Sequence, residues 1–135
     1  MKLSLKSEYA CLALIDLAKH HDQGLRTTAK IAEVQGIPKK FLEQILLALK
    51  YGGYLQSRKG AGGGYRLAKD PQSITLAEVI RLMDGSLAPV ASVSKFFYQP
   101  TPVLKHKRLY RVFKDIRDYT ASTLEKTTFG DLIGR

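Results

Sequence analysis

Cysteine, acidic side chains and long apolar runs are scarce in this sequence of 135 residues. The only cysteine, Cys11, excludes a disulfide within the chain and fits a reducing compartment. No apolar run approaches the length of roughly 20 residues that a membrane-spanning helix needs. The apolar stretch 9–18 contains Asp16 and precedes no cleavage site, so we expect no signal peptide. These absences predict a soluble, cytoplasmic protein with no membrane partner.

Acidic residues are outnumbered, because 22 Lys and Arg against 12 Asp and Glu leave a formal net charge of +10. The excess is uneven: residues 1–69 hold 12 basic and 5 acidic residues, whereas residues 70–135 hold 10 and 7. A basic domain attracts polyanions, so the charge favours a nucleic acid that binds the first half. The alternative is that the charge serves solubility alone.

Motifs of catalysis, metal binding and nucleotide binding are also absent. The glycines at 60 and 62–64 do not make a dinucleotide fingerprint, because Tyr65 stands where the third glycine belongs and no helix follows. No P-loop, H-E-x-x-H or G-x-S-x-G sequence occurs, and the three histidines lack metal-ligand spacing. We predict that the chain is not an enzyme and has no metal site of these kinds.

Helical periodicity fills the first half of the chain. Residues 5–20 predict one helix, a short second helix opens at Thr27 or Thr28 and ends at Gly36, and residues 38–51 predict a third that begins with a proline. A short helix, a tight turn and a longer helix make a helix-turn-helix.

The third of these helices has an apolar side and a polar side. Its predicted core residues are Leu42, Ile45, Leu46 and Leu49, and its opposite side carries Lys40, Glu43, Gln44 and Leu47. Lys39 and Lys40 could bind phosphates at the helix start. Gln44 has the paired donor and acceptor that read adenine, and Glu43 could accept from cytosine. Leu47 suits a thymine methyl group or a contact between subunits.

A hairpin is predicted directly after the helix-turn-helix, with strands over 54–58 and 65–67 and a glycine tip between them. This order is the layout of a winged helix. A bare tip at Gly62 would let Arg58 and Lys59 approach a nucleic-acid backbone or a minor groove. The alternative is a solvated hairpin.

The second half predicts a fourth helix from a Thr75–Glu78 capping box, a loop over 86–102 and a long helix over about 103–125. The loop holds Phe96, Phe97 and Tyr98, which are too many aromatics for a plain linker. The apolar stripe of the long helix consists of Leu109, Val112, Phe113, Ile116, Thr120 and Leu124. Such a stripe often packs on a second copy, so we predict a homodimer; the alternative is packing on its own domain.

The predicted fold is therefore mainly α with a small β-hairpin. It divides into a winged helix-turn-helix domain over 1–85 (helix-turn-helix about 28–51, wing about 54–67), the loop 86–102, and the dimerisation helix with a terminal turn over 103–135.

Three stretches carry a family resemblance: MKLSLKSEYACLALIDLA, then IAEVQGIPKKFLEQILLALKYGGYLQSRKGAGGGYRLAKDPQSITLAEVIRLMDG, and the terminal TTFGDL. Together they resemble the Rrf-two family of bacterial winged-helix transcription regulators, which includes an iron–sulfur cluster regulator and a cysteine-metabolism repressor. The likeness covers nearly the whole chain, and residues 37–67 are its most specific part.

The resemblance implies a homodimer of crossed long helices, with the third helix in the major groove of DNA and the wing in the minor groove. By position, Lys40, Glu43 and Gln44 match the base-reading residues of the family. Lys59 matches its wing cation, and Thr28 matches a phosphate-contacting helix start.

The chain departs from the cluster-binding members of this family. They place three cysteines between the fourth helix and the long helix, whereas this loop has none, and Cys11 alone cannot replace them. We therefore expect no iron–sulfur cluster and no other cofactor. The cysteine-metabolism repressor also lacks these cysteines and responds through a partner enzyme, which makes a regulatory protein partner an expectation for this chain.

The function predicted from all these features is sequence-specific binding of double-stranded DNA by a homodimeric transcription regulator, most simply a repressor. Two alternatives stay open. One is a protein-interaction module that kept the winged-helix fold, and the other is a redox sensor that uses Cys11.

Overall fold

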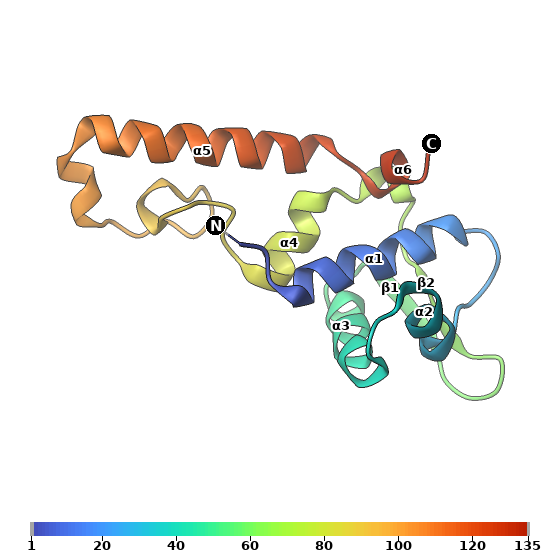
Figure 1. The fold of residues 1–135 in the computed structure, drawn as a ribbon. Helices are drawn as coiled ribbons and strands as arrows, with labels where there is room; N and C mark the ends of the chain where they lie inside the picture. Colours follow the sequence, from blue (N-terminus) through green and yellow to red (C-terminus); the bar gives the residue numbers. More distant parts are fainter. Residues whose placement is uncertain (1, 135) are drawn as a thin grey trace.

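The computed structural model describes residues 2–134. Their elements are α1 (Leu5–Lys19), α2 (Thr28–Gln35), α3 (Lys39–Tyr51), β1 (Leu55–Arg58), β2 (Gly64–Leu67), the 3-10 turn η1 (Pro71–Ser73), α4 (Leu76–Asp84), the 3-10 turns η2 (Ala91–Val93) and η3 (Pro102–Lys105), α5 (Lys107–Lys126) and α6 (Phe129–Leu132). Figure 1 shows α5 lying along one side of the molecule, with α1 and α4 beneath it and α2, α3 and the hairpin furthest away. The predicted fold class, mainly α with one small hairpin, is confirmed.

The helix boundaries follow local capping chemistry. The Ser4 hydroxyl accepts from the Ser7 amide at the start of α1, and Thr27 does the same for Lys30 at the start of α2. Gly36 ends α2 in the left-handed region, with a φ of 69° that favours glycine. The predicted capping box of α4 is present.

Pro38 occupies a slightly different place from the one that the sequence predicts. It is the N-cap residue of α3, with an extended ψ of 126°, and Lys39 is the first helical residue. A proline at the N-cap still has no amide to leave unpaired, so the helix start loses nothing.

The core lies between α1 and α3. All four apolar residues predicted for the inner side of α3 are fully buried. They pack in one cluster with Leu14 and Leu17 of α1, with Ile31 of α2, and with Leu55 and Leu67 of the hairpin. The buried stripe of α3 explains the orientation of the helix, because a side with this stripe must face the core.

The hairpin pairs β1 with β2 in antiparallel register from Leu55–Leu67 at its base to Arg58–Gly64 near its tip. Side chains alternate along it, so Leu55 and Leu67 face the core while Gln56 and Arg66 face solvent. A third short segment joins the sheet edge, since Arg26 and Tyr65 form an antiparallel bridge.

The long helix begins later than predicted. Residues 102–105 form the 3-10 turn η3, and α5 starts at Lys107 and not at 103. The reason is local: Pro102 opens the 3-10 turn, and His106 has a ψ of 86°, which breaks the helical path between the two elements. The loop 86–102 is also more ordered than a plain loop, because it contains η2 with a buried Val93 and a hydrogen bond from Thr101 to Ser92.

The C-terminal turn folds back onto the winged helix. Two backbone hydrogen bonds hold it, from the Leu76 amide to the Thr127 carbonyl and from the Phe129 amide to the Ile74 carbonyl, at 2.9 and 3.0 Å. The Phe129 side chain is completely buried in the same core as α1 and α3. Within residues 2–134, no helix has the length and apolar character needed to cross a membrane.

Phe129→Ala should lower the free energy of unfolding by about 3–5 kcal/mol, because it leaves a cavity in the core. Leu132→Ala removes an exposed side chain of the same turn and should cost about 1 kcal/mol or less. Urea denaturation of the two variants measures the difference. Equal losses would mean that Phe129 does not belong to the core.

Candidate nucleic-acid interface

The outward side of α3 is polar and open to solvent. Lys39, Lys40, Glu43, Gln44 and Leu47 are all exposed, as the periodicity predicts, because the opposite side of the helix is held in the core. The two lysines stand at the N-terminal end of α3. A helix side that offers cations, an amide and a carboxylate to solvent has the groups that contact phosphates and base edges.

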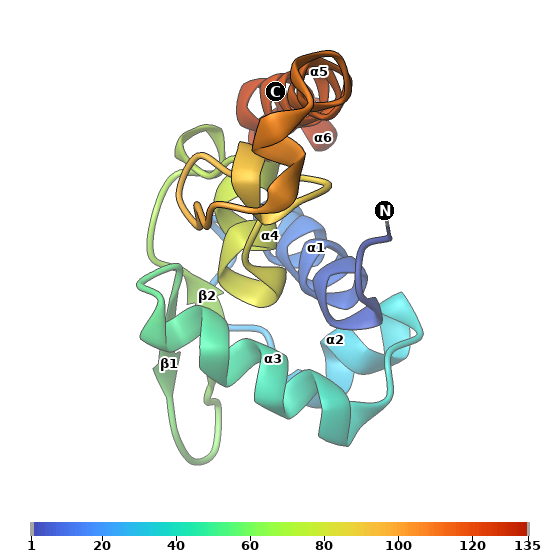
Figure 2. The same cartoon turned by 90° about the vertical axis from the view of Figure 1, so that its left-hand side faces the viewer.

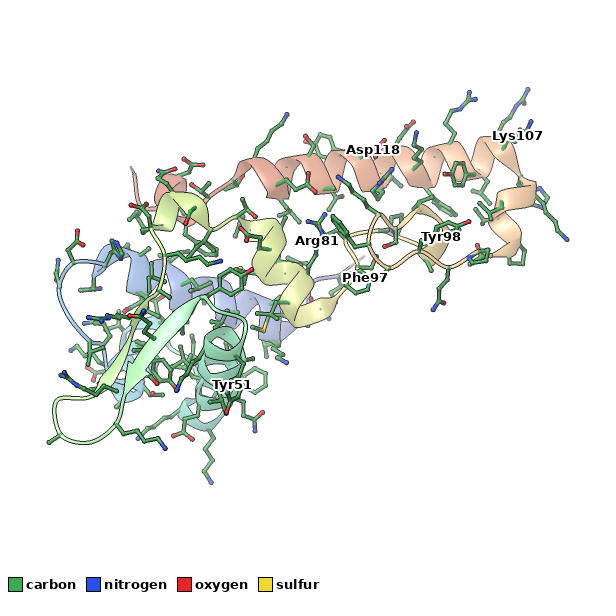
Figure 3. The ribbon with its side chains drawn as sticks, turned by 180° about the vertical axis from the view of Figure 1, so that it is seen from behind. Tyr51, Arg81, Phe97, Tyr98, Lys107 and Asp118 are labelled. Atoms are coloured by element: carbon green, nitrogen blue, oxygen red, sulfur yellow. The ribbon has the colours of Figure 1, made fainter. Side chains whose placement is uncertain are left out.

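Tyr51 continues this side of α3 and was missed by the sequence reasoning. It follows Gln44 by seven residues and Leu47 by four, which is the spacing that places it on the same side. It is 79% exposed, and Figure 3 shows it on the outer side of α3. Burial, followed by the charge of Glu43 and then Tyr51, raises the pKa of Tyr65 above 10.0, so these side chains lie near one another where α3 meets the hairpin.

The hairpin presents two cations directly before a bare tip. Arg58 and Lys59 are exposed, and the Arg58 guanidinium donates to the Gly62 carbonyl at 3.4 Å. Gly60 and Gly62 have φ values of 89° and 73°, which side chains other than glycine rarely adopt. The tip therefore turns tightly with no large side chain in front of it.

Arg66 is a third hairpin cation, and it too was missed. It lies opposite Gln56 on the solvent face of the sheet and donates to the Gln56 side chain at 3.0 Å. Together with Arg58 and Gly62 it lines an open hollow of about 510 Å³ beside the strands. The signal that could have found it is strand alternation, because buried Leu67 places its neighbour Arg66 outward.

The outer side of α3 and the hairpin tip lie on the same side of the molecule, opposite α5 (Figure 2). Thr28 is the first residue of α2 and is half-buried. The fold thus gathers the residues predicted to bind DNA on one basic side of the winged helix. Whether each of them touches DNA stays a prediction.

Comparisons with known proteins identify the family. The model of the Rrf2 family, described as an iron-dependent transcriptional regulator, matches residues 3–135. The chain belongs to the Rrf2 family.

Similar proteins and solved structures support this membership. The transcriptional regulator CymR of Bacillus subtilis is 33% identical over 98% of this chain and 89% of its own length. The regulator IscR of Escherichia coli is 35% identical over 98% of this chain and 80% of its own length. The solved structure of CymR, titled the global cysteine regulator of B. subtilis, superposes with a TM-score of 0.80 at 31% identity, covering 98% of this chain and 96% of that one.

These matches confirm two predictions from the sequence. The fold is the winged helix of the Rrf2 family, and the chain is a regulator of transcription and not an enzyme, because the matched family and relatives are regulators.

The long helix of this Rrf2-family chain is only partly covered by its own domain. Ala121 is the one residue of α5 that is buried. The predicted stripe divides: Phe113, Ile116, Thr120 and Leu124 are half-buried, whereas Leu109 and Val112 are exposed. The N-terminal half of α5 extends beyond the winged helix, as Figure 1 shows.

The three aromatics of the loop stand beside basic side chains. Phe96, Phe97 and Tyr98 are all exposed, and the Arg81 guanidinium lies 4.5 Å from the centre of the Phe96 ring. Arg81 also donates to Glu125 of α5 at 2.8 Å, which lowers the pKa of that carboxyl below 4.5. A cation–π contact and an ion pair thus join α4, the loop and α5 where Figure 3 shows Arg81 and Phe97.

An iron–sulfur cluster held by three cysteines does not fit this chain, although the family description names iron. The sequence has one cysteine. Burial and then the charge of Asp84 raise the pKa of Cys11 from 9.0 to about 11, which disfavours the thiolate that ligates iron. Within residues 2–134, the structure brings together no group of three or more His, Cys, Asp or Glu side chains that could hold a metal ion.

Cys11 should react slowly with thiol reagents in the native protein. A pKa near 11 means that thiolate forms only as the pH rises toward that value. At pH 8 the labelling rate should be about a hundredfold below that of the unfolded chain. Stopped-flow labelling with and without denaturant measures the ratio. Equal rates would support the alternative of a redox sensor that uses Cys11.

Proposed function

We propose that this Rrf2-family protein binds DNA of a specific sequence as a homodimer and represses transcription in the cytoplasm, without an iron–sulfur cluster. The observation that carries the proposal is the basic side on which α3 and the wing lie together. The family membership supports regulation of transcription, and the geometry supports DNA as the ligand.

The helix α3 suits the major groove. It spans 13 residues, has one side open to solvent and exposes Lys39 and Lys40 at its N-terminal end. These lysines would bind phosphates and fix the register of the helix. Gln44 and Glu43, one turn further in, would read base edges, because a major groove admits an α-helix and displays a distinct pattern for each base pair.

The hairpin suits the minor groove. Its tip carries glycine in place of side chains, so the backbone could approach the DNA closely, and Arg58 and Lys59 would enter the negative potential of a narrow groove. Thr28 at the start of α2 would contact the backbone beside it.

The exposed side of α5 is proposed to pack against a second copy of the chain. Leu109 and Val112 stay exposed on a single chain, while the other stripe residues are half-buried. A symmetric dimer would bury these residues and place two α3 helices on DNA, so that the operator would be palindromic. Repression is the simplest outcome of a dimer that occupies promoter DNA.

A regulatory protein partner is part of the same proposal. The exposed aromatics Phe96, Phe97 and Tyr98 are large apolar groups outside the face proposed for DNA, and exposed aromatic clusters often mark contact surfaces. The alternative of an interaction module without DNA specificity predicts only weak binding to any DNA sequence.

Gln44→Ala and Lys59→Ala should weaken DNA binding in different ways. Gln44→Ala should cost about 1–3 kcal/mol at one base position, because it removes a base contact. Lys59→Ala should weaken binding to all sequences and lower the slope of log affinity against log salt by about one. Fluorescence anisotropy with the protein's own promoter DNA, over a range of salt concentrations, measures both effects.

Gln99→Ala and Lys126→Ala are the matched controls, because both side chains are exposed and lie outside the proposed face. They should leave affinity and salt slope unchanged. If the four variants behave alike, the roles given to Gln44 and Lys59 are wrong. If the wild-type protein shows no preference for its promoter, the interaction-module alternative gains support.

Val112→Glu should convert the dimer to monomer, because it places a charge in the proposed dimer interface. Lys114→Glu, two residues further along and on the other side of α5, should leave the dimer intact. Sedimentation velocity distinguishes the two variants. A wild-type protein that sediments as a monomer at micromolar concentration would contradict the proposed dimer.

A further inference from the structure

A buried ion pair lies beneath the candidate interface and takes no part in it. Asp16 of α1 is only 1% exposed, and its carboxylate accepts two hydrogen bonds from Arg26, at 2.9 and 3.0 Å. The Gln35 amide donates to the same carboxylate at 3.2 Å. His20 lies close by, with its Nδ1 bonded to the Asp16 carbonyl at 2.8 Å.

This carboxylate connects both ends of α2 to α1. Arg26 stands just before the N-cap residue Thr27, and Gln35 is the last residue of α2. A single side chain of α1 therefore holds the start and the end of the first helix of the helix-turn-helix. The planar guanidinium meets the carboxylate through two parallel bonds, which fix its orientation as well as its distance.

The backbone of Arg26 is hydrogen-bonded to strand β2 of the wing. Its amide donates to the Tyr65 carbonyl, and its carbonyl accepts from the Tyr65 amide, both at 2.8 Å. Gly64 lies against the Arg26 carbonyl so closely that a Cβ atom would clash with it. Arg26 thus has its side chain anchored on α1 and its main chain paired with β2.

Such an ion pair is a costly way to gain stability, because the Asp16 carboxylate and most of the Arg26 side chain leave water, and apolar residues often stabilise a core as well. Its advantage here is geometric. Two apolar side chains in contact could shift along each other. The two parallel hydrogen bonds between Arg26 and Asp16 fix where the Arg26 backbone lies, and hence where β2 starts. Arg58, the last residue of β1, pairs with Gly64 at the start of that strand, and Lys59 follows Arg58 into the tip.

We propose that Asp16 and Arg26 are positioning residues that set the wing relative to α3, and so control DNA affinity without touching DNA. This inference rests on the proposed function. It predicts that damage to the pair acts through the wing cations and leaves base reading by α3 unchanged.

Arg26→Lys tests the inference, because lysine keeps the positive charge but cannot make two parallel hydrogen bonds to the Asp16 carboxylate. In a salt titration with promoter DNA, it should lower the slope of log affinity against log salt by about one, as loss of a wing phosphate contact does. When Arg26→Lys is added to the double variant Arg58→Ala, Lys59→Ala, the salt slope should not change further. With Gln44→Ala the effects should add, because distant sites are independent.

Arg81→Lys is the matched control. Arg81 also pairs with a carboxylate, that of Glu125 at 2.8 Å, but it lies between α4 and α5 and away from the wing. The salt slope should stay at the wild-type value. An equal loss in Arg81→Lys and Arg26→Lys would overturn the inference, because it would reflect general damage to the protein.

Gly64→Ala provides a second test that leaves the ion pair intact. It adds a Cβ against the Arg26 carbonyl and should push the wing away, with the same loss of salt slope as Arg26→Lys. Gly85→Ala is its control, since Gly85 has a similarly unfavourable φ of 87° and open space around it. Identical behaviour of the two glycine variants would count against the inference.

Amide hydrogen exchange of the DNA-free protein separates this inference from the proposed function. In Arg26→Lys, exchange of the Tyr65 amide should rise at least tenfold, while amides of the buried side of α3 should keep wild-type protection. If α3 loses protection equally, the pair is a general stabiliser and the inference fails. If the wild-type protein does not bind promoter DNA but the exchange result holds, only the proposed function fails.

Discussion

A carboxylate buried at the inner side of α1 must find donors, because an unpaired charge in a protein interior is strongly unfavourable. Asp16 finds three, two from Arg26 and one from Gln35. Those donors come from either end of α2, and Arg26 also pairs with β2 through its main chain. One requirement, that a buried charge be satisfied, therefore arranges α1, α2 and the hairpin around a common point.

The apolar core completes this arrangement from the other side. The stripe of α3 is fully buried against α1, so the polar side of the helix must face outward. The exposed cations of α3 and the wing lie on one side, and α5 and the aromatic loop, whose exposed side chains include Leu109, Val112 and Phe96, form another. The two sides need not compete for the same residues, which suits the proposed function, in which one side binds DNA and the other a second copy of the chain.

Local periodicity was a reliable guide wherever one residue's environment depends on its near neighbours. The buried and exposed sides of α3, the capping box at Thr75 and the glycine turn at the hairpin tip all follow from spacings of two to four residues. The start of α5 was placed too early, because an apolar pattern continues through Val103 while the backbone breaks at His106. Phe129 was not recognised as a core residue, since its burial depends on Ile74, which lies far away in the sequence.

By itself, the sequence determined the helix-turn-helix, the wing, the basic character of the first half and the lack of cluster cysteines, because each depends on composition or short-range spacing. Only the tertiary structure decided that Asp16 and Arg26 form an ion pair and that Phe129 closes the core. The physical reason is the same in each case. A partner ten or more residues away is chosen by packing in three dimensions, and no local pattern encodes which residue it will be.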